Sequence, residues 1–363
     1  MMTAPLIMVG AGHAHLVALR DWVKQGYRAP AGSLLVTPQA DAWYSGMMPG
    51  LIAGRWQAEQ CCADLAPLCR AAGVSLQLDR LSTLDAGRST LQLASGTSLT
   101  GHLISLNYGA GNPAPAYSDG SVELVGAKPF ETLYQRWRQW RKAASPVRIA
   151  VLGGGPAAVE LVLALQQALP ACQLTLICAG WLLGAQPPRA ARLTRTLLAT
   201  RGISLQEQHH ISHIQGGALL TGDGRAVLSD AVILATGTAA APWQASSELA
   251  TDAAGFIRIK DTLQSQSHPH ILASGDCAAL TGCPHSGVYA VRQGAVLGHN
   301  LRALLRGSSA LHHFQPQPRA LALLATADAQ ALACYGPFAL RSRAARRLKD
   351  YLDTGFMRSL RVL

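Results

Sequence analysis

Short apolar runs recur along the chain, and several of them end at a glycine turn that precedes a helical pattern. The first run covers residues 5–9, is followed by Gly10 and Gly12, and leads into a helical pattern over residues 13–25. The second run covers residues 147–152 and leads through three glycines into another helical pattern. This alternation is typical of parallel α/β architecture. Because the two units lie far apart in the chain, they predict an α/β fold with two Rossmann-like dinucleotide-binding domains.

Two further segments have patterns that fit more than one structure. Residues 130–144 predict a helix with Leu133, Trp137 and Trp140 on one face and basic residues around it. Basic and aromatic residues can bind nucleic acid, but this pattern is more often an amphipathic surface helix, so we expect no nucleic acid partner. Residues 320–340 contain short apolar runs interrupted by Ala-Asp-Ala-Gln, which predicts a hairpin rather than a membrane span.

The composition is that of a folded protein with a basic excess. Of the 363 residues, 49% are hydrophobic and 14% are charged, which excludes an intrinsically disordered chain. The 31 Lys and Arg residues exceed the 20 Asp and Glu residues by 11. The 8 cysteines are too irregularly placed for a disulfide scaffold, and the first residues lack the basic start of a signal peptide. We therefore expect a cytoplasmic location.

Nearly half of the basic excess is concentrated at the C-terminal end. Residues 341–363 contain seven cations and two anions, and Leu348, Leu352, Phe356 and Leu360 recur among them at helical spacing. This pattern predicts a basic amphipathic helix. Two interpretations stay open: peripheral contact with the inner face of the cell membrane, and packing onto the body of the protein or onto a second subunit of a homo-oligomer.

The two glycine turns have the residue types that a dinucleotide pyrophosphate requires. The backbone must approach the phosphates closely and present free N–H groups at a helix N-terminus, and glycine permits both. Gly10 and Gly12 fill the first two positions of the fingerprint, but His15 stands where a third glycine is usual. In the second turn Gly153 and Gly155 are followed by an alanine at the third position, which the fingerprint tolerates.

Acidic side chains at strand ends give a mixed picture. A carboxylate that binds the adenosine ribose is expected at the end of the second strand of each unit, but Thr37 and Cys178 occupy those places. These two positions therefore indicate no preference between NADH and NADPH. Two later apolar runs end at Gly237 and at Gly275-Asp276. Asp276 is placed either to accept hydrogen bonds from a polyol or to cap a helix.

Four motifs in this order, GAGHAH, GGGPAAVE, LATG and SGDCA, resemble the FAD-dependent pyridine nucleotide-disulfide oxidoreductase superfamily, which includes the type II NADH dehydrogenases. Within it, the segments YSGMMPGLIAG, SGVYAVRQG and RLKDYLDTGFM are similar to the flavoprotein module found fused to selenophosphate synthetase. The likeness covers nearly the whole chain. It implies FAD as cofactor and NAD(P)H as substrate. It also implies a discontinuous FAD-binding domain (1–112 and 246–318), an inserted NAD(P)H-binding domain (113–245) and a C-terminal hairpin and helix (319–363).

The resemblance also implies roles for individual residues. Gly10 and Gly12 would lie on the FAD pyrophosphate and Asp276 on its ribityl chain, while Gly153 and Gly155 would bind the NAD(P)H pyrophosphate. Glu160 would lie near the nicotinamide, and residues 44–49 and 288–293 would approach the isoalloxazine. Glu160 and Tyr44 are the expected catalytic residues. The remaining expected cofactor contacts are His13, Ala14, Thr37, Ser45, Gly46, Gly109, Pro156, Gly237, Val288 and Tyr289.

Cysteine and histidine positions limit the chemistry. A disulfide reductase needs a cysteine pair beside the flavin, and residues 43–48 contain none. Vicinal Cys61-Cys62 would form a strained disulfide, so we expect no redox role for this pair. His209, His210 and His213 lack a carboxylate or cysteine at ligand spacing, and we expect no metal site. His13 either influences the flavin potential or packs against the first helix.

Without a dithiol, a flavin that takes a hydride from NAD(P)H would pass electrons directly to a separate acceptor. We predict an FAD-dependent NAD(P)H dehydrogenase whose acceptor is a quinone or another small oxidant. Two alternatives stay open. The first is a reductase of selenium metabolism with selenophosphate synthetase as partner, and the second is a flavin-binding docking protein that has lost nicotinamide turnover.

Overall fold

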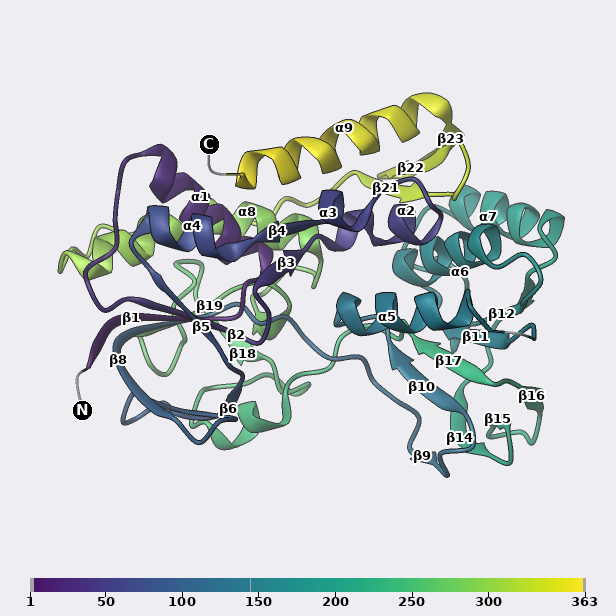
Figure 1. Cartoon of the computed structure of the whole chain (residues 1–363), viewed down its shortest axis with the longest axis horizontal. Coiled ribbons are helices and arrows are strands. Elements are labelled where there is room, and N and C mark those ends of the chain that lie inside the picture. The colour runs from purple at the N-terminus through teal and green to yellow at the C-terminus, as the bar shows by residue number, and fades with distance from the viewer. Residues whose placement is uncertain (1–2, 144, 362–363) are drawn as a thin grey trace.

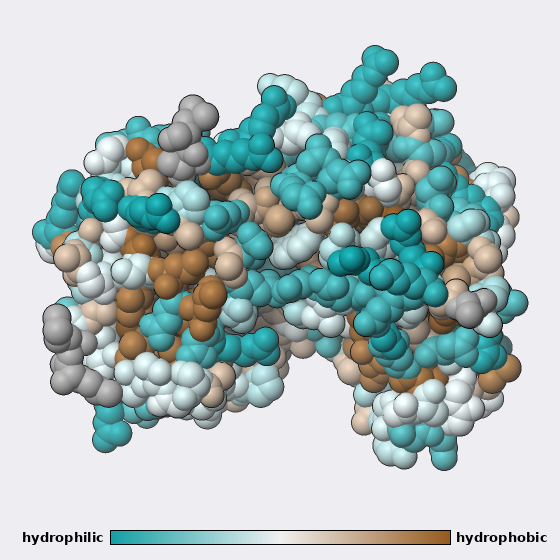
Figure 2. Space-filling model, in the orientation of Figure 1, coloured by the Kyte–Doolittle hydropathy of each residue, from teal (hydrophilic) through white to brown (hydrophobic). Residues whose placement is uncertain are grey.

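A computed structural model describes residues 3–143 and 145–361. Two lobes, each built around a parallel sheet, lie side by side, and a long C-terminal helix runs along one edge across both (Figure 1). Figure 2 shows a notch between the lobes on the side away from this helix. The mixed α/β fold agrees with the prediction, while the exact domain boundaries stay a prediction.

The first lobe contains a seven-stranded sheet. Its parallel part has Val9 beside Val36 on one side and beside Leu106 on the other, so the strand before the first glycine turn is central, and its last four residues are buried. The strands in spatial order are β5 (Ser75–Leu78), β2 (Leu34–Thr37), β1 (Ala4–Val9), β8 (Ser98–Leu106), β7 (Thr90–Leu93) and β6 (Leu81–Asp85), with β19 (Ile271–Ala273) also pairing with β8.

Three helices of the first lobe are α1 (His13–Lys24), α4 (Leu65–Ala72) and α8 (Gly287–Leu305). Helices α1 and α8 pack tightly against each other because glycines face the contact. A Cβ atom on Gly294 would lie 2.4 Å from the Cβ of Val17, and one on Gly298 would lie 3.1 Å from the Cα of Ala18. Residues far apart in the chain therefore form one layer over the first glycine turn.

The second lobe has a five-stranded parallel sheet and, as an extension, a separate four-stranded sheet of mixed strand direction. Leu133, Trp137 and Trp140 of α5 (Phe130–Trp140) are buried, which confirms the predicted amphipathic helix. The sheet order is β10 (Glu123–Gly126), β17 (Ala231–Leu234), β11 (Arg148–Leu152), β12 (Gln173–Ile177) and β13 (Ser204–Gln206), with helices α6 (Pro156–Ala168) and α7 (Pro188–Thr200). The extension has the order β16 (Ala226–Leu228), β15 (Ala218–Thr221), β14 (Ile211–Gln215) and β9 (Tyr117–Ser118).

The C-terminal segment differs from its prediction in two respects. The predicted hairpin is a three-stranded antiparallel sheet of β21 (Ala322–Ala325), β22 (Ala331–Tyr335) and β23 (Phe338–Ser342). The predicted helix exists as α9 (Arg343–Leu360), and its buried face coincides only in part with the predicted apolar positions. Leu348 and Leu352 are 42% and 48% exposed, whereas Lys349 and Asp353 are buried. These charges are paired inside the protein, and of the predicted apolar positions Leu360 is buried. Residues 362 and 363 lie outside the described range.

Short elements complete the chain. Within the described residues, every helix is too short or too polar to cross a membrane. The short elements are β3 (Asp41–Trp43), η1 (Ser45–Met47), α2 (Met48–Ile52), α3 (Ala58–Cys61), β4 (Cys62–Asp64), η2 (Pro242–Ser246), β18 (Ile257–Arg258), η3 (Gly275–Cys277) and β20 (Ala278–Ala279).

Candidate functional site

The first glycine turn closes tightly between β1 and α1. Gly10 has a φ of +84°, and a Cβ atom there would lie 2.4 Å from the Cα of Tyr108. A Cβ atom on Gly12 would lie 2.3 Å from Oδ1 of Asn107. Both positions therefore need glycine, as the fingerprint predicts.

His15, in place of the third glycine, is part of the packing. Its Nδ1 lies 2.6 Å from the carbonyl oxygen of Gly10, and its Nε2 lies 2.7 Å from Oγ of Ser105 on β8. The ring is fully buried, which lowers its pKa to about 4, while the Gly10 contact acts in the opposite direction. His15 thus joins α1 to the sheet through hydrogen bonds. In proteins that have glycine at this position, the helix and the strand pack closely through their backbones instead.

Asn107 organises the turn and was missed in the sequence. Its Oδ1 accepts hydrogen bonds from the backbone N–H groups of Ala14 (3.1 Å) and His15 (3.2 Å), and its Nδ2 donates to the carbonyl of Ser274 (2.7 Å). One side chain therefore connects the glycine turn of β1 with the loop that carries Asp276. The only sequence signal is its position directly after the apolar strand β8.

Three aromatic rings meet beside the turn. The ring centroids of His13 and Tyr44 are 5.4 Å apart, those of Tyr44 and Phe356 4.8 Å, and those of His13 and Phe356 5.7 Å. The pKa of His13 is lowered to about 4 by burial, with a raising contribution from Asp276 and a lowering one from Lys128. The ring is therefore neutral at neutral pH, and Phe356 brings α9 to the predicted site.

Several buried polar atoms near the first turn are left unpaired among the described residues. They are Nε2 of His13, Oγ of Ser274 and Oδ1 of Asp276. The other carboxylate oxygen of Asp276 lies 2.6 Å from Nζ of Lys128, an ion pair that the sequence did not suggest. Buried polar groups without partners carry a free-energy cost, so this group fits a polar ligand. Together with the glycine turn, it fits the dinucleotide that the motifs predict.

The second glycine turn has similar backbone constraints. Gly153 has a φ of +140°, and a Cβ atom there would lie 2.2 Å from the carbonyl oxygen of Ala235. Gly155 precedes Pro156 at the N-terminus of α6, and open space surrounds its Cβ position. Cys178 is fully buried, and burial raises its pKa to about 12. The nearest carboxylate, Glu207, is paired with Arg195, so no free acid takes the place of the missing ribose ligand among the described residues.

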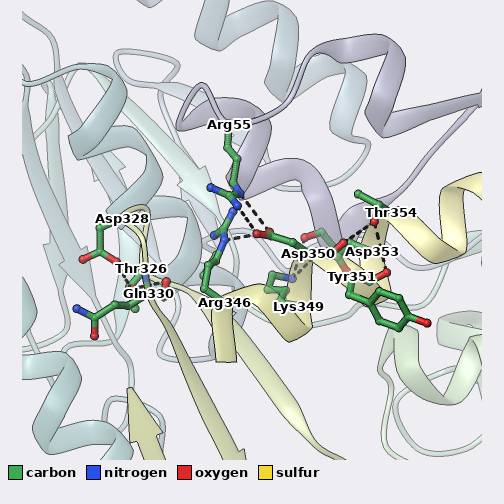
Figure 3. Close-up of polar contacts among 12 residues, drawn as sticks. Arg55, Thr326, Asp328, Gln330, Arg346, Lys349, Asp350, Tyr351, Asp353 and Thr354 are labelled. Carbon is green, nitrogen blue, oxygen red and sulfur yellow. Dashed lines mark hydrogen bonds and ion pairs between the residues drawn. The ribbon is translucent and has the colours of Figure 1, made fainter. Parts of the chain in front are cut away.

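Glu160 of α6 belongs to a buried charge cluster with Lys349 and Asp353 of α9, and Figure 3 shows these two residues of α9. Its Oε1 accepts a hydrogen bond from the backbone of Ala325 (2.7 Å) and lies 3.8 Å from Nζ of Lys349. The same Nζ lies 3.2 Å from Oδ2 of Asp353 and donates to the carbonyl of Gly46 (3.0 Å). Tyr44 in turn donates from its hydroxyl to Oδ1 of Asp353 (3.2 Å).

The protonation of this cluster follows from burial and pairing. Burial raises the pKa of Glu160, although Lys349 counteracts it, and burial likewise raises the pKa of Asp353. Burial opposes the charge of Lys349, but the two carboxylates outweigh it and raise its pKa. Burial and Asp353 raise the pKa of Tyr44, so its hydroxyl keeps its proton. The two expected catalytic residues, Tyr44 and Glu160, are thus joined through Lys349 and Asp353.

The other expected contacts are distributed around these turns. Ser45 and Gly46 lie beside Tyr44, and a Cβ atom on Gly46 would lie 2.8 Å from the Tyr44 ring. Ala14 is in the first turn of α1, Gly109 follows β8 and Gly237 follows β17. Val288 and Tyr289 open α8, and the Tyr289 hydroxyl donates to Gln317, away from the turn. Thr37 is buried at the end of β2, where its carbonyl accepts from Asp79.

Cysteines do not form a redox centre in the described chain. All 8 are free, and burial raises the pKa values of Cys61 and Cys277 to about 12. Thiolate chemistry at neutral pH is therefore disfavoured.

Among the described residues, no group of three or more His, Cys, Asp or Glu side chains is arranged to hold a metal ion.

A groove on the outer side of α9 ends at the aromatic cluster. Its volume is about 620 Å³. Phe356 lines the groove and also contacts the rings of His13 and Tyr44, so this side chain belongs both to the groove and to the aromatic cluster. The lining residues are Arg20, Tyr351, Leu352, Gly355, Phe356, Arg358 and Ser359.

Comparison with protein families gives a match over most of the chain. The model described as "Pyridine nucleotide-disulphide oxidoreductase" matches residues 4–294. Ferroptosis suppressor protein 1 of Taeniopygia guttata is 26% identical over 57% of this chain and 58% of its own length. Type II NADH:quinone oxidoreductase of Haemophilus influenzae is 33% identical over 37% of this chain and 34% of its own length. The matches thus span less than two thirds of the length of each of these relatives.

Solved structures share the fold across nearly the whole chain. The sulfide:quinone oxidoreductase of Aquifex aeolicus superposes with a TM-score of 0.79 at 15% identity, covering 99% of this chain and 92% of the other. The water-forming NADH oxidase of Lactobacillus brevis superposes with a TM-score of 0.75 at 18% identity, covering 91% and 75%. At these identities the superpositions show the common fold.

Proposed function

This chain belongs to the pyridine nucleotide-disulphide oxidoreductase family of FAD-dependent, NAD(P)H-using enzymes, and we propose from that premise that it transfers electrons from NAD(P)H to a quinone. The observation that carries the proposal is the junction of the two lobes at Tyr44 and Glu160. Tyr44 lies beside the first glycine turn and Glu160 follows the second, and α9 connects them. A donor and an acceptor of electrons can therefore both reach one site.

Residues of the first lobe would hold FAD, which supplies the redox chemistry when bound. Gly10 and Gly12 would admit the pyrophosphate. Asp276 would accept a hydrogen bond from the ribityl chain, which would replace part of its interaction with Lys128. The unpaired atoms of His13 and Ser274 offer two further polar contacts. The neutral His13 ring would keep the site free of an extra positive charge.

Residues of the second lobe would hold NAD(P)H. Gly153 and Gly155 would take the pyrophosphate at the N-terminus of α6, and Glu160 would face the nicotinamide. Neither Cys178 nor the paired Glu207 offers a free carboxylate to the adenosine ribose, so selectivity between NADH and NADPH has to come from other contacts. We assign residues 113–245 to this domain and the flanking residues 1–112 and 246–318 to the FAD domain.

A quinone acceptor is supported by the relatives and by the groove on α9. Two curated relatives are a NADH:quinone oxidoreductase and ferroptosis suppressor protein 1, and the groove ends at Phe356 beside the expected flavin. Leu348 and Leu352 stand exposed on α9, and the surrounding edge of the molecule is strongly hydrophilic (Figure 2). Apolar residues among cations suit the surface of an anionic membrane, where quinones are dissolved. We therefore propose peripheral contact through α9.

The proposal is tested by the visible spectrum of the purified protein and by anaerobic titration with NADH and NADPH. A flavin spectrum that one nucleotide bleaches at one equivalent is the expected result. Absence of flavin would refute the proposal. Bound flavin that neither nucleotide bleaches would instead support a docking protein without nicotinamide turnover. A role in selenium metabolism, with selenophosphate synthetase as partner, rests on the sequence motifs alone and stays a prediction.

A further inference from the structure

The cluster of Glu160, Lys349 and Asp353 contains one more carboxylate than ammonium groups. With all three ionised it would carry a charge of about −1 in a region where only 14%, 10% and 8% of the three side chains are exposed. Burial makes an ionised carboxylate costly, so it favours a protonated carboxyl in the cluster, while Lys349 and the neighbouring Arg346 oppose protonation. The raised pKa values of Glu160 and Asp353 have the direction that this argument requires.

The proton of this cluster has one continuous route to the aromatic site. Asp353 accepts a hydrogen bond from Tyr44, and the centroid of the Tyr44 ring lies 4.8 Å from that of Phe356, which lines the groove. The route therefore runs from the buried cluster to a phenol hydroxyl whose ring contacts a side chain of that groove. Neither Asp353 nor its bond to Tyr44 is needed to bind a dinucleotide at the two glycine turns.

Resting on the proposed function, we propose that Asp353 and Tyr44 deliver a proton to the quinone. Reduction of a quinone to a quinol takes two electrons and two protons. A hydride from NAD(P)H supplies two electrons and one proton, so a second proton must come from the protein. As the electron pair reaches the quinone, the O–H bond of Tyr44 breaks and a new O–H bond forms on the quinone oxygen. The carboxyl of Asp353 returns a proton to Tyr44, and a proton from water restores the cluster.

The titration of Asp353 depends on every charged group packed around it. Its nearest cation, Lys349, favours the ionised carboxylate, whereas burial and Asp350 oppose it. Cys61 on α3 stays protonated at neutral pH because its pKa is raised to about 12, so it adds no charge. The groups that face Asp353 are Lys349, Arg346 and Asp350 on α9, Glu160 on α6, Cys61 on α3 and Tyr44 before η1.

Two variants separate proton delivery from structure. Asp353→Asn keeps the size of the side chain and an oxygen that accepts the Tyr44 hydrogen bond, but it cannot carry the proton. Tyr44→Phe removes the donor. Asp223→Asn and Tyr117→Phe are matched controls, because Asp223 pairs with Arg225 at the exposed surface of the second lobe and Tyr117 is 49% exposed on β9.

The test is anaerobic reoxidation of the reduced flavin in a stopped-flow instrument. Dithionite reduces the flavin, so the result is independent of whether NADH or NADPH bleaches the wild type, which is the separate test of the proposed function. We expect soluble quinone to reoxidise both variants on the order of a hundredfold more slowly, with a flattened pH profile and a changed solvent isotope effect. Ferricyanide accepts electrons without protons and should reoxidise the variants at the wild-type rate.

Two outcomes would overturn proton delivery by Asp353 and Tyr44. One is quinone reoxidation of both variants at the wild-type rate and isotope effect. The other is equal slowing with quinone and with ferricyanide, which would indicate a structural role. A readout without flavin is infrared difference spectroscopy of the apoprotein between acid and alkaline pH. The wild type should show the band of a protonated buried carboxyl that Asp353→Asn lacks, and identical spectra would contradict the assignment.

Discussion

Nζ of Lys349 on α9 lies 3.8 Å from Oε1 of Glu160 on α6, so the C-terminal helix is tied by charge to the second lobe. The same ammonium group contacts Asp353 and the carbonyl of Gly46 in the first lobe. Helix α9 therefore connects the two lobes through buried contacts, while its other face is exposed. The role of Lys349 in stability can be measured separately from any activity.

Replacing Lys349 with Met should destabilise the protein strongly. It leaves the buried carboxylates of Glu160 and Asp353 without their cation, and loss of one partner of a buried pair costs about 3–5 kcal/mol. Urea unfolding monitored by tryptophan fluorescence checks this expectation. Lys142→Met is the control, since that side chain is exposed, and a similar free energy of unfolding for the two variants would contradict the structural role.

Replacing Asn107 with Ala should release the first glycine turn and weaken flavin binding. The backbone N–H groups of Ala14 and His15 would lose their acceptor, at about 1–3 kcal/mol for each buried group. The flavin-to-protein absorbance ratio after gel filtration measures the effect. Gln92→Ala removes an exposed amide side chain on β7 that contacts Ser98, and the expectation fails if both variants retain flavin equally.

His15 should make the protein less stable in mild acid. Its folded pKa is about 4, below the ordinary value of 6.5, so between these values the unfolded state binds more protons. Stability is complete above about pH 6.5 and falls toward pH 4, by about 2 kcal/mol between pH 7 and pH 5 for this ring. Urea unfolding at both pH values, compared with His15→Gln, measures the difference. An unchanged pH dependence in the variant would show that His15 is not responsible.

Replacing both Leu348 and Leu352 with Glu should abolish binding to anionic liposomes. The two side chains are 42% and 48% exposed, so the change removes apolar contact and adds negative charge without creating a cavity. Co-sedimentation is expected to fall about tenfold or more, because two apolar contacts are lost and the anionic surface repels the two added carboxylates. The control Leu228→Glu, 62% exposed in the other lobe, should bind as the wild type does. Full binding by the double variant would exclude membrane contact through α9.

Sequence patterns predicted the features that depend on neighbouring residues. The strands before Gly10 and Gly153 and the helices after Gly12 and Gly155 follow from local apolar runs and from backbone requirements, and all are present. The site between them depends on contacts across long stretches of chain. Asn107 reaches Ala14 across 93 positions, and Lys128 reaches Asp276 across 148.

The buried face of α9 shows the physical limit of such patterns. Leucines at helical spacing predicted an apolar face of α9 that meets either a membrane or the protein. Leu348 and Leu352 are exposed, whereas Lys349 and Asp353 are buried because Glu160 and Tyr44 supply partners for them. A sequence contains no local signal for a charge that is paired inside the fold. Likewise, His15 replaces a glycine only because Ser105 lies opposite it on β8.

The most direct measurement is the stoichiometry of a single anaerobic turnover. The purified flavoprotein is mixed with one equivalent of NADH or NADPH and then with a soluble quinone, and the quinol is quantified. Electron transfer from nicotinamide through FAD to quinone predicts one quinol per nucleotide oxidised and full return of the flavin spectrum. A flavin that stays bleached in the presence of quinone, with no quinol formed, would contradict the proposed function.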